Sequence, residues 1–329
     1  MPNLDSKWHC FRHVLMRWWT PILMEKSELT LGKLIKINKN SGSKPELSVR
    51  IDENLMEFPL PDRPLPNKIR FKHLNIRYID HSVIAFLRSN KQIWDRNGTN
   101  LKLSIANANV QPFWDVLTSE IWPIFASNIR HLGFDDGSHL DNLRRRASPT
   151  ILTDLINLNS ICSFCLCPDG IADDGPNATA AQALSKWLHT PSKDGQPKQF
   201  HYFNSPLNLG WINDFKETFR RATTSVSYTI QLYFRVEPMP IEPFELVNEV
   251  TKEKLTLKHS EEYNLVNWLL QRCPIGETAT APVEFALRHA NYSGANLNNI
   301  RFDLWDGNRC IGPLSLPAEE EEADESNEK

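Results

Sequence analysis

The sequence predicts an α/β fold, a leucine-rich-repeat-like βα solenoid, and two features of the chain support this prediction. An apolar-x-x-apolar-x-apolar signature recurs every 28 to 36 residues, with copies that start at Phe71, Asn100, Ile129, Ile161, Pro197 and Ser225. Helical patterns fill the gaps between copies. In such a solenoid parallel strands line one face and helices cover the other. An ordinary doubly wound sheet is the alternative. It is disfavoured because the strands share one signature and no phosphate-binding glycine loop is present.

The first 67 residues divide into two predicted regions. Residues 1–57 contain a short helical element over residues 1–24, then strands over residues 28–37 and 46–51 that could pair as a hairpin. Residues 58–67 hold four prolines. Because proline fixes φ and removes a backbone donor, we expect an extended linker there.

Residues 68–236 are the predicted βα repeat region. In its first unit, a strand over residues 71–76 leads to a helix capped by Asp80 or Ser82. The turn at residues 97–98 then precedes a second strand, in which Leu101, Leu103 and Ile105 alternate. Further helices are predicted at residues 113–125, 149–158, 178–188 and 211–221.

Residues 237–316 predict a small β-rich module, and residues 317–329 an acidic disordered tail. The module contains a hairpin over residues 244–258, a strand or helix at 264–270 and a last strand at 299–305. The tail has seven acidic residues and one lysine, a net charge of −6, which leaves +3 of the total −3 for residues 1–316. A body of +3 does not predict electrostatic binding to nucleic acid.

Reactive side chains do not form a recognisable catalytic motif. Cys162, Cys165 and Cys167 are the cluster most suggestive of metal, but no second cysteine pair completes a zinc site. We therefore predict structural cysteines, no metal, no cofactor and no catalytic residue. The run Arg144-Arg145-Arg146 is interpreted as a solvated helix end.

The expected compartment is the cytoplasm or nucleus. Charged residues interrupt the apolar residues near the amino terminus, no apolar run is long enough to span a bilayer, and six cysteines fit reduced thiols. Neither a membrane nor a nucleic acid is therefore expected as a partner.

Candidate binding residues follow from the alternation of side chains across the predicted strands. They are the residues expected on the exposed side of the repeats: His73, Asn75, Arg77, Lys102, Ser104, His131, His201 and Phe203.

Several longer stretches carry a resemblance that runs from about residue 28 to residue 313. They include LPNKIRFKHLNIRYIDHSVIAFLRSNKQIWDRNGTNLKLS, LRRRASPTILTDLINLNSI, PDGIADDGPNATAAQALSKWLHTPSKDGQPKQF, PIEPFELVNEVTKEKLTLKH and LLQRCPI. Together they resemble the region C-terminal to the F-box in the large nematode family of F-box proteins. The resemblance implies substrate recognition for a ubiquitin ligase complex, in which an F-box docks on the ligase adaptor subunit. Residues 1–24 are shorter than the three-helix F-box of that family. The F-box is thus expected to be truncated or missing, and adaptor docking to require its restoration.

The leading functional hypothesis is a non-catalytic protein-interaction module of F-box-protein type, whose protein target is unknown. A second is a hydrolase-type enzyme with a site around Glu245, Glu253 and His259. A third is a structural scaffold whose acidic tail binds basic partners.

Overall fold

The fold is taken from a computed structural model of the chain. It describes residues 29–31, 35–39, 44–51, 54–61, 63–65, 69–71, 73–96, 98–105, 111–203, 210–234, 242–260, 266–276, 297–304 and 312. The expected helical element at residues 1–24 and the acidic tail at 317–329 lie outside these residues.

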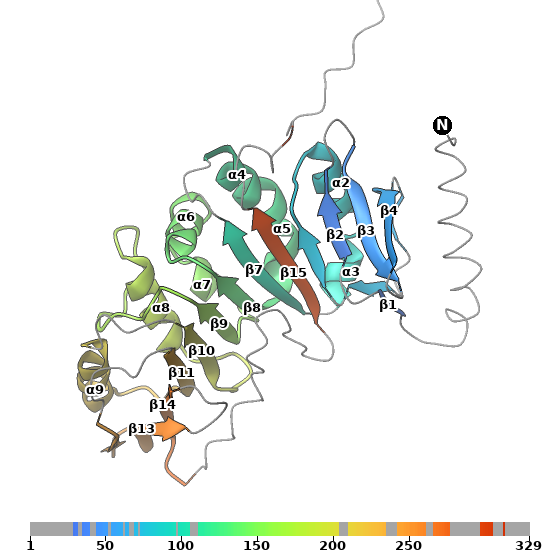
Figure 1. The fold of residues 1–329 in the computed structure, drawn as a ribbon. Coiled ribbons are helices and arrows are strands. Elements are labelled where there is room, and N and C mark those ends of the chain that lie inside the picture. Colours follow the sequence, from blue (N-terminus) through green and yellow to red (C-terminus); the bar gives the residue numbers. More distant parts are fainter. Residues whose placement is uncertain are drawn as a thin grey trace, which may run out of the picture.

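One mixed sheet of thirteen strands runs the length of the molecule (Figure 1). Its centre is parallel, in the order β11 (Tyr228–Phe234), β10 (Lys198–Phe203), β9 (Ser160–Ser163), β8 (Ile129–Phe134), β7 (Thr99–Ile105), β15 (Asn298–Leu304), β6 (Leu74–Ile76) and β2 (Ile35–Asn38). Apart from β15 and β2, these strands follow one another in chain order, so the direction of winding does not reverse from β6 to β11.

Antiparallel strands complete the sheet at both ends. At one end β2 pairs with β3 (Glu46–Ile51), which pairs with β4 (Asn54–Pro59). At the other end β11 pairs with β14 (Val266–Pro274), followed by β13 (Glu253–Ser260) and β12 (Phe244–Asn248). The two expected hairpins are therefore confirmed, and the ambiguous segment near residue 266 is a strand. A separate parallel pair joins β1 (Leu29–Leu31) to β5 (Ile69–Phe71).

Helices fill the crossovers between the parallel strands. They are α2 (His81–Ser89), α3 (Lys91–Arg96), α4 (Gln111–Val116), the π-helix η1 (Leu117–Ile121), α5 (Trp122–Phe125), the 3₁₀ turn η2 (Ala126–Asn128), α6 (Ser138–Arg146), α7 (Ile151–Asp154), α8 (Ala180–Leu188) and α9 (Trp211–Arg221). The expected cap of the first helix is confirmed, because the Asp80 carboxylate accepts hydrogen bonds from the backbone N–H groups of Ser82 and Val83 at 2.9 and 3.1 Å.

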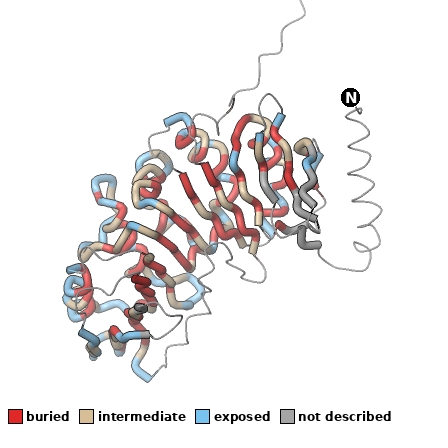
Figure 2. The backbone as a smooth tube through the Cα atoms, in the orientation of Figure 1, coloured by how far each residue is buried: buried red, intermediate tan, exposed pale blue. Residues whose placement is uncertain are grey.

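One face of the sheet forms the hydrophobic core. A row of apolar side chains crosses seven parallel strands in register and packs in one cluster with apolar residues of the helices: Leu74, Ile300, Leu101, Leu132, Ile161, Phe200 and Ile230. Figure 2 shows this buried centre extending along the sheet. The next residues along these strands point to the opposite face, because side chains alternate. The helices therefore cover one face, and the opposite face carries mainly polar residues. An α/β fold with a mostly parallel sheet is confirmed.

The register of two repeats differs from the prediction. Ile161 and Ser163 lie beside Leu132 and Phe134, because β9 starts at Ser160 and ends at Ser163. The signature that starts at Ile161 predicts Phe164 and Leu166 on the buried face of this strand, but both follow the strand and are half-buried, so this prediction is wrong. In β7 the residues beside Leu132 and Phe134 are likewise Leu101 and Leu103, two positions earlier than the signature indicated.

The last strand also lies where the sequence did not predict it. β15 was expected in the C-terminal module, but it inserts in parallel between β6 and β7. One sheet thus contains strands from all three expected regions, 1–57, 68–236 and 237–316. The predicted boundaries between these regions do not correspond to breaks in the sheet. The proline-rich segment at residues 58–67 is partly packed. Pro59 ends β4, and the buried Leu65 donates its backbone N–H to Asn90 Oδ1 at 2.8 Å.

Arg144 is a buried residue and not part of a solvated helix end. Its guanidinium donates to the carbonyl oxygens of Pro149 at 3.0 Å, of Gly175 at 2.9 Å and of Ala178. These bonds connect the loop before α8 to α6. The interpretation of the arginine run as a solvated helix end is therefore wrong for Arg144.

Candidate interaction site

The eight candidate binding residues all occupy the polar side of the strands. Asn75 and Lys102 lie on either side of Arg301 in β15, in one row of register. His201 lies in the same row, beyond Gly133 and Cys162. The others stand two residues before or after this row on their own strands, and two residues is the repeat that returns a side chain to the same face. They are His73, Arg77, Ser104, His131 and Phe203.

An ion-pair network joins four neighbouring strands at their carboxyl ends. Asp303 accepts a hydrogen bond from Asn75 Nδ2 at 3.1 Å, and its oxygens lie 3.4 Å from Arg77 and 3.4 Å from Arg301. Arg301 also donates to Ser104 Oγ at 3.0 Å. Both carboxylate oxygens of Asp303 therefore have a donor. The side chain of Arg77 is 46% exposed, whereas that of Asp303 is 6% exposed.

Asp135, directly after β8, continues the network. Its carboxylate pairs with Lys102 Nζ at 2.9 Å, lies 3.8 Å from Arg301 Nη2 and accepts a hydrogen bond from Ser104. A turn aspartate is thus held against the sheet face by residues of two neighbouring strands. The network contains three cations and two carboxylates, so it carries a positive balance.

Aromatic rings extend the site across the strands that follow. Phe203 stacks on Tyr233, with centroids 4.5 Å apart and planes 5° apart, and on Phe164, with centroids 5.4 Å apart. Lys102 Nζ lies 5.0 Å from the centroid of the Phe164 ring, which connects the stack to the charged network. We call this set the polar–aromatic band: Asn75, Arg77, Lys102, Ser104, Asp135, Phe164, Phe203, Tyr233, Arg301 and Asp303.

Two histidines of the polar face, His131 and His201, are neutral at pH 7. Burial lowers the pKa of His131 to about 4, helped by the charge of Arg130. Burial also lowers the pKa of His201 to about 3, helped by His131 and opposed by a hydrogen bond with Gln231. His201 is 2% exposed and Ser104 is fully buried, so the expectation that these two residues are exposed is wrong, whereas His73 and His131 are half-buried.

Half of the band was not found from the sequence. Arg301 and Asp303 were missed because nothing local indicates that β15 enters the repeat region. Asp135 was not among the candidate residues, although its position directly after a strand was a usable signal. Phe164 was assigned to the buried face because the register of β9 was predicted wrongly. Tyr233 lies beyond the signature positions of the copy that starts at Ser225.

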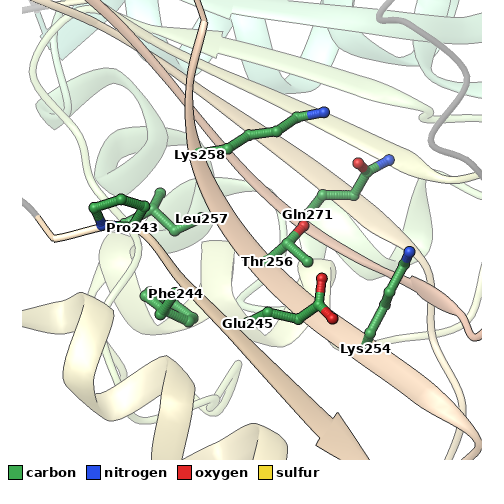
Figure 3. A pocket seen from close by; sticks show the side chains of 8 residues that line it. All are labelled: Pro243, Phe244, Glu245, Lys254, Thr256, Leu257, Lys258 and Gln271. Atoms are coloured by element: carbon green, nitrogen blue, oxygen red, sulfur yellow. The ribbon is translucent and has the colours of Figure 1, made fainter.

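The proposed enzyme residues do not form one site. Glu253 and His259 lie six residues apart on β13, which corresponds to about 20 Å. Glu253 is buried and bound to Arg272, Ser225 and Val226. A shallow cavity of about 460 Å³ has Glu245, Lys254, Lys258 and Gln271 among its lining residues but neither Glu253 nor His259 (Figure 3).

The cysteine cluster is divided between a strand and a loop. Cys162 is buried in β9, Cys165 is exposed, and burial raises the pKa of the half-buried Cys167 to about 12. Among the described residues, no group of three or more histidine, cysteine or acidic side chains is placed to hold a metal ion. Within the same part of the chain, no helix combines the length and apolar character needed to cross a bilayer.

Comparisons with known proteins give no match to this chain, whether against protein-family models, curated proteins or solved structures.

Proposed function

We propose that this chain is a non-catalytic protein-interaction module of F-box-protein type, whose polar–aromatic band binds a segment of a target protein. The observation that supports this most is the joining of charged and aromatic side chains from successive parallel strands into one continuous set. In parallel sheets the carboxyl ends of strands are where ligands commonly bind. A set that spans many strands fits an extended ligand better than a small molecule.

The chemistry of the band favours an acidic or carbonyl-rich segment. Arg77 is 46% exposed and Lys102 and Arg301 are half-buried, and each pairs with Asp135 or Asp303, so their remaining N–H groups are the donors that a partner meets. Stacking covers the faces of the aromatic rings, so a partner meets ring edges, which carry positive partial charge. Both halves of the band therefore attract electron-rich groups.

The same proposal includes the leucine-rich-repeat-like solenoid. The strands β6 to β11 follow one another without reversal, and the core occupies a single face of the sheet. Both are properties of a solenoid and differ from a doubly wound sheet, whose strand order reverses. The inserted β15 is a departure from a simple repeat.

Selection from a library of short random peptides tests the proposal. We expect the full chain to enrich acidic sequences, and the double variant Arg77→Gln/Lys102→Gln to lose at least about tenfold in affinity for them, since two charge-assisted contacts disappear. Lys193→Gln/Arg221→Gln is the matched control, because it removes two exposed cations outside the band. Equal losses in both double variants, or no enrichment of acidic peptides, would contradict the proposal.

Ligase docking is a separate part of the proposal. We expect the 329-residue chain by itself not to co-purify with the ligase adaptor subunit, and a fusion with an added F-box to do so. Stoichiometric co-purification of the chain without the added F-box would contradict this expectation.

A further inference from the structure

After β15 the chain returns, at Gly312, to the segment that follows β6. Gly312 donates its backbone N–H to the carbonyl oxygen of Ile79 at 2.8 Å, and the hydroxyl of Tyr78 leaves no room for a side chain at this glycine. Tyr78 and Ile79 directly follow Arg77 at the carboxyl end of β6. Gly312 is thus held against the segment that directly follows Arg77 at the carboxyl end of β6.

The surface around Gly312 is basic. Lys39 is exposed, donates to Tyr78 Oη at 3.1 Å and lies 4.9 Å above the tyrosine ring. Arg77 stands next in the chain to Tyr78, and Asp303 beneath it is nearly buried. The nearby Asp80 carboxylate is also occupied, because it caps α2. Lys39 and Arg77 are thus exposed cations on the described part of this surface.

The acidic tail begins within reach of this surface. Glu319 is seven residues beyond Gly312, and seven residues span at most about 25 Å. All seven acidic residues of the tail fall between Glu319 and Glu328. A short tether gives such a segment a local concentration in the millimolar range, so a weak intrinsic affinity is enough to keep it bound.

We infer that the acidic tail docks on a basic surface formed by Arg77, Lys102 and Arg301 of the polar–aromatic band together with the nearby Lys39, and competes there with the acidic segment of a target. The competition rests on the proposed function, whereas docking of the tail does not. The tail then acts as an internal pseudo-ligand that a target must displace.

Carbodiimide cross-linking of the full chain, followed by mass spectrometry, tests docking directly, because it joins carboxylates only to nearby amines. We expect the tail to cross-link to Lys39 and Lys102 in preference to the exposed Lys193 and Lys258. The yield at Lys39 is expected to fall several-fold in Gly312→Val, which displaces the anchor, and with added salt, which screens the attraction. Tail cross-links spread evenly over all exposed lysines, or absent, would overturn the inference.

Competition is tested with a fluorescent peptide that has the sequence of residues 317–329. It is expected to bind about tenfold more tightly to a full chain with Glu319, Glu320, Glu321 and Glu322 changed to Gln than to wild type, since the tethered competitor is weakened. Equal binding to both chains, or none to either, would overturn the inference. If tail cross-links form as expected but the band variants leave peptide selection unchanged, the proposed function fails while docking of the tail stands.

Discussion

Glu253 and Arg272 form a buried ion pair at the junction of the parallel and antiparallel parts of the sheet. The pair is 0–1% exposed, with Arg272 Nη2 2.6 Å from Glu253 Oε2. The carboxylate also accepts from Ser225 Oγ and Val226 N, both at 2.8 Å, and Arg272 donates to the Thr224 carbonyl at 2.9 Å. The pair therefore holds the segment that leads into β11 against β13 and β14.

Removal of one partner leaves the other charge buried without compensation. We expect Glu253→Gln to lower the free energy of unfolding by about 3–5 kcal/mol, measured by urea denaturation. Glu249→Gln is the control, because Glu249 pairs with Lys252 at the surface and its loss should stay within about 0.5 kcal/mol. Similar losses in the two variants would show that the buried pair does not stabilise the fold.

Leu132 tests the core at the same scale. It is 1% exposed and lies between Leu101 and Ile161 in the apolar row. We expect Leu132→Ala to cost about 2–5 kcal/mol in the free energy of unfolding, because it opens a cavity between neighbouring strands. Leu166→Ala should cost clearly less, since Leu166 is half-buried and lies beyond β9. A larger loss at Leu166 would contradict the register observed here.

At the scale of elements, β15 is the part of the fold that most depends on long-range contacts. Asn298 is fully buried and donates from Nδ2 to the Ile93 carbonyl at 3.0 Å, while its Oδ1 accepts from the Phe71 backbone N–H at 3.4 Å. Asn299 Oδ1 accepts from Asn100 Nδ2 at 2.9 Å, across 199 residues of sequence. The strand thus completes both the core and the charged network.

The sequence predicted well what local chemistry determines. The start of α2 was predictable because Asp80 caps it, α9 because its apolar residues repeat with helical spacing, and the hairpin of β12 and β13 because a polar turn separates two alternating segments. Alternation along the strands also placed the candidate binding residues on the polar face, although Ser104 and His201 are buried there and not exposed as expected. These features depend on residues close together in the chain.

What could not be predicted depends on pairing over long distances. The apolar residues of β15 alternate as in any half-buried strand: Ile300, Phe302 and Leu304. Their pattern is therefore compatible with several positions of the strand in the sheet. For this reason Arg301 and Asp303 of the band were not predicted from the sequence. In β9, the residues Ile161, Phe164 and Leu166 match the repeat signature, but only Ile161 lies in the strand on its buried face. The sequence pattern does not reveal this, because the register is set by the pairing of Ile161 with Leu132.

Phe302 is the residue with which to test β15. It is fully buried in β15, between Ile76 of β6 and Leu103 of β7. We expect Phe302→Ala to cost about 3–5 kcal/mol and to raise hydrogen exchange first in β6 and β7. Phe244→Ala, at the half-exposed edge strand β12, is the control and should leave exchange in β6 and β7 unchanged. Protection of β6 and β7 that persists in Phe302→Ala would show that β15 is not needed to hold them.

At the scale of the whole molecule, one sheet connects the regions that the sequence separates. β14 pairs with β11, β2 with β6, and β15 closes the space between β6 and β7. A substitution that destabilises one region should therefore destabilise the others as well. This differs from a simple repeat array, in which each unit contacts only its neighbours. A condition that acts on several elements at once should unfold the chain as a unit.

Acid pH is such a condition, because His201 is buried in β10, and the half-buried His131 and His189 lie in β8 and against Tyr228 of β11. Burial is the main cause that lowers the pKa of His131 and His189 to about 4 and that of His201 to about 3, against an ordinary value of 6.5. For His189, the charges of Arg272 and Lys198 add to this effect. The native chain keeps these rings neutral at pH values where the unfolded chain already binds protons.

Stability should therefore be complete above about pH 6.5 and fall as the pH drops towards 4, by up to about 1.4 kcal/mol per pH unit for each histidine. Three such groups lose about 6 kcal/mol by pH 5, which is comparable with the whole stability of many domains. Urea denaturation from pH 8 to 5 measures this slope, and His201→Gln should make it shallower. His259→Gln, at an exposed position of β13, should leave the slope as in wild type. Equal unfolding free energies at pH 7.5 and pH 5 would mean that the buried rings do not control acid stability.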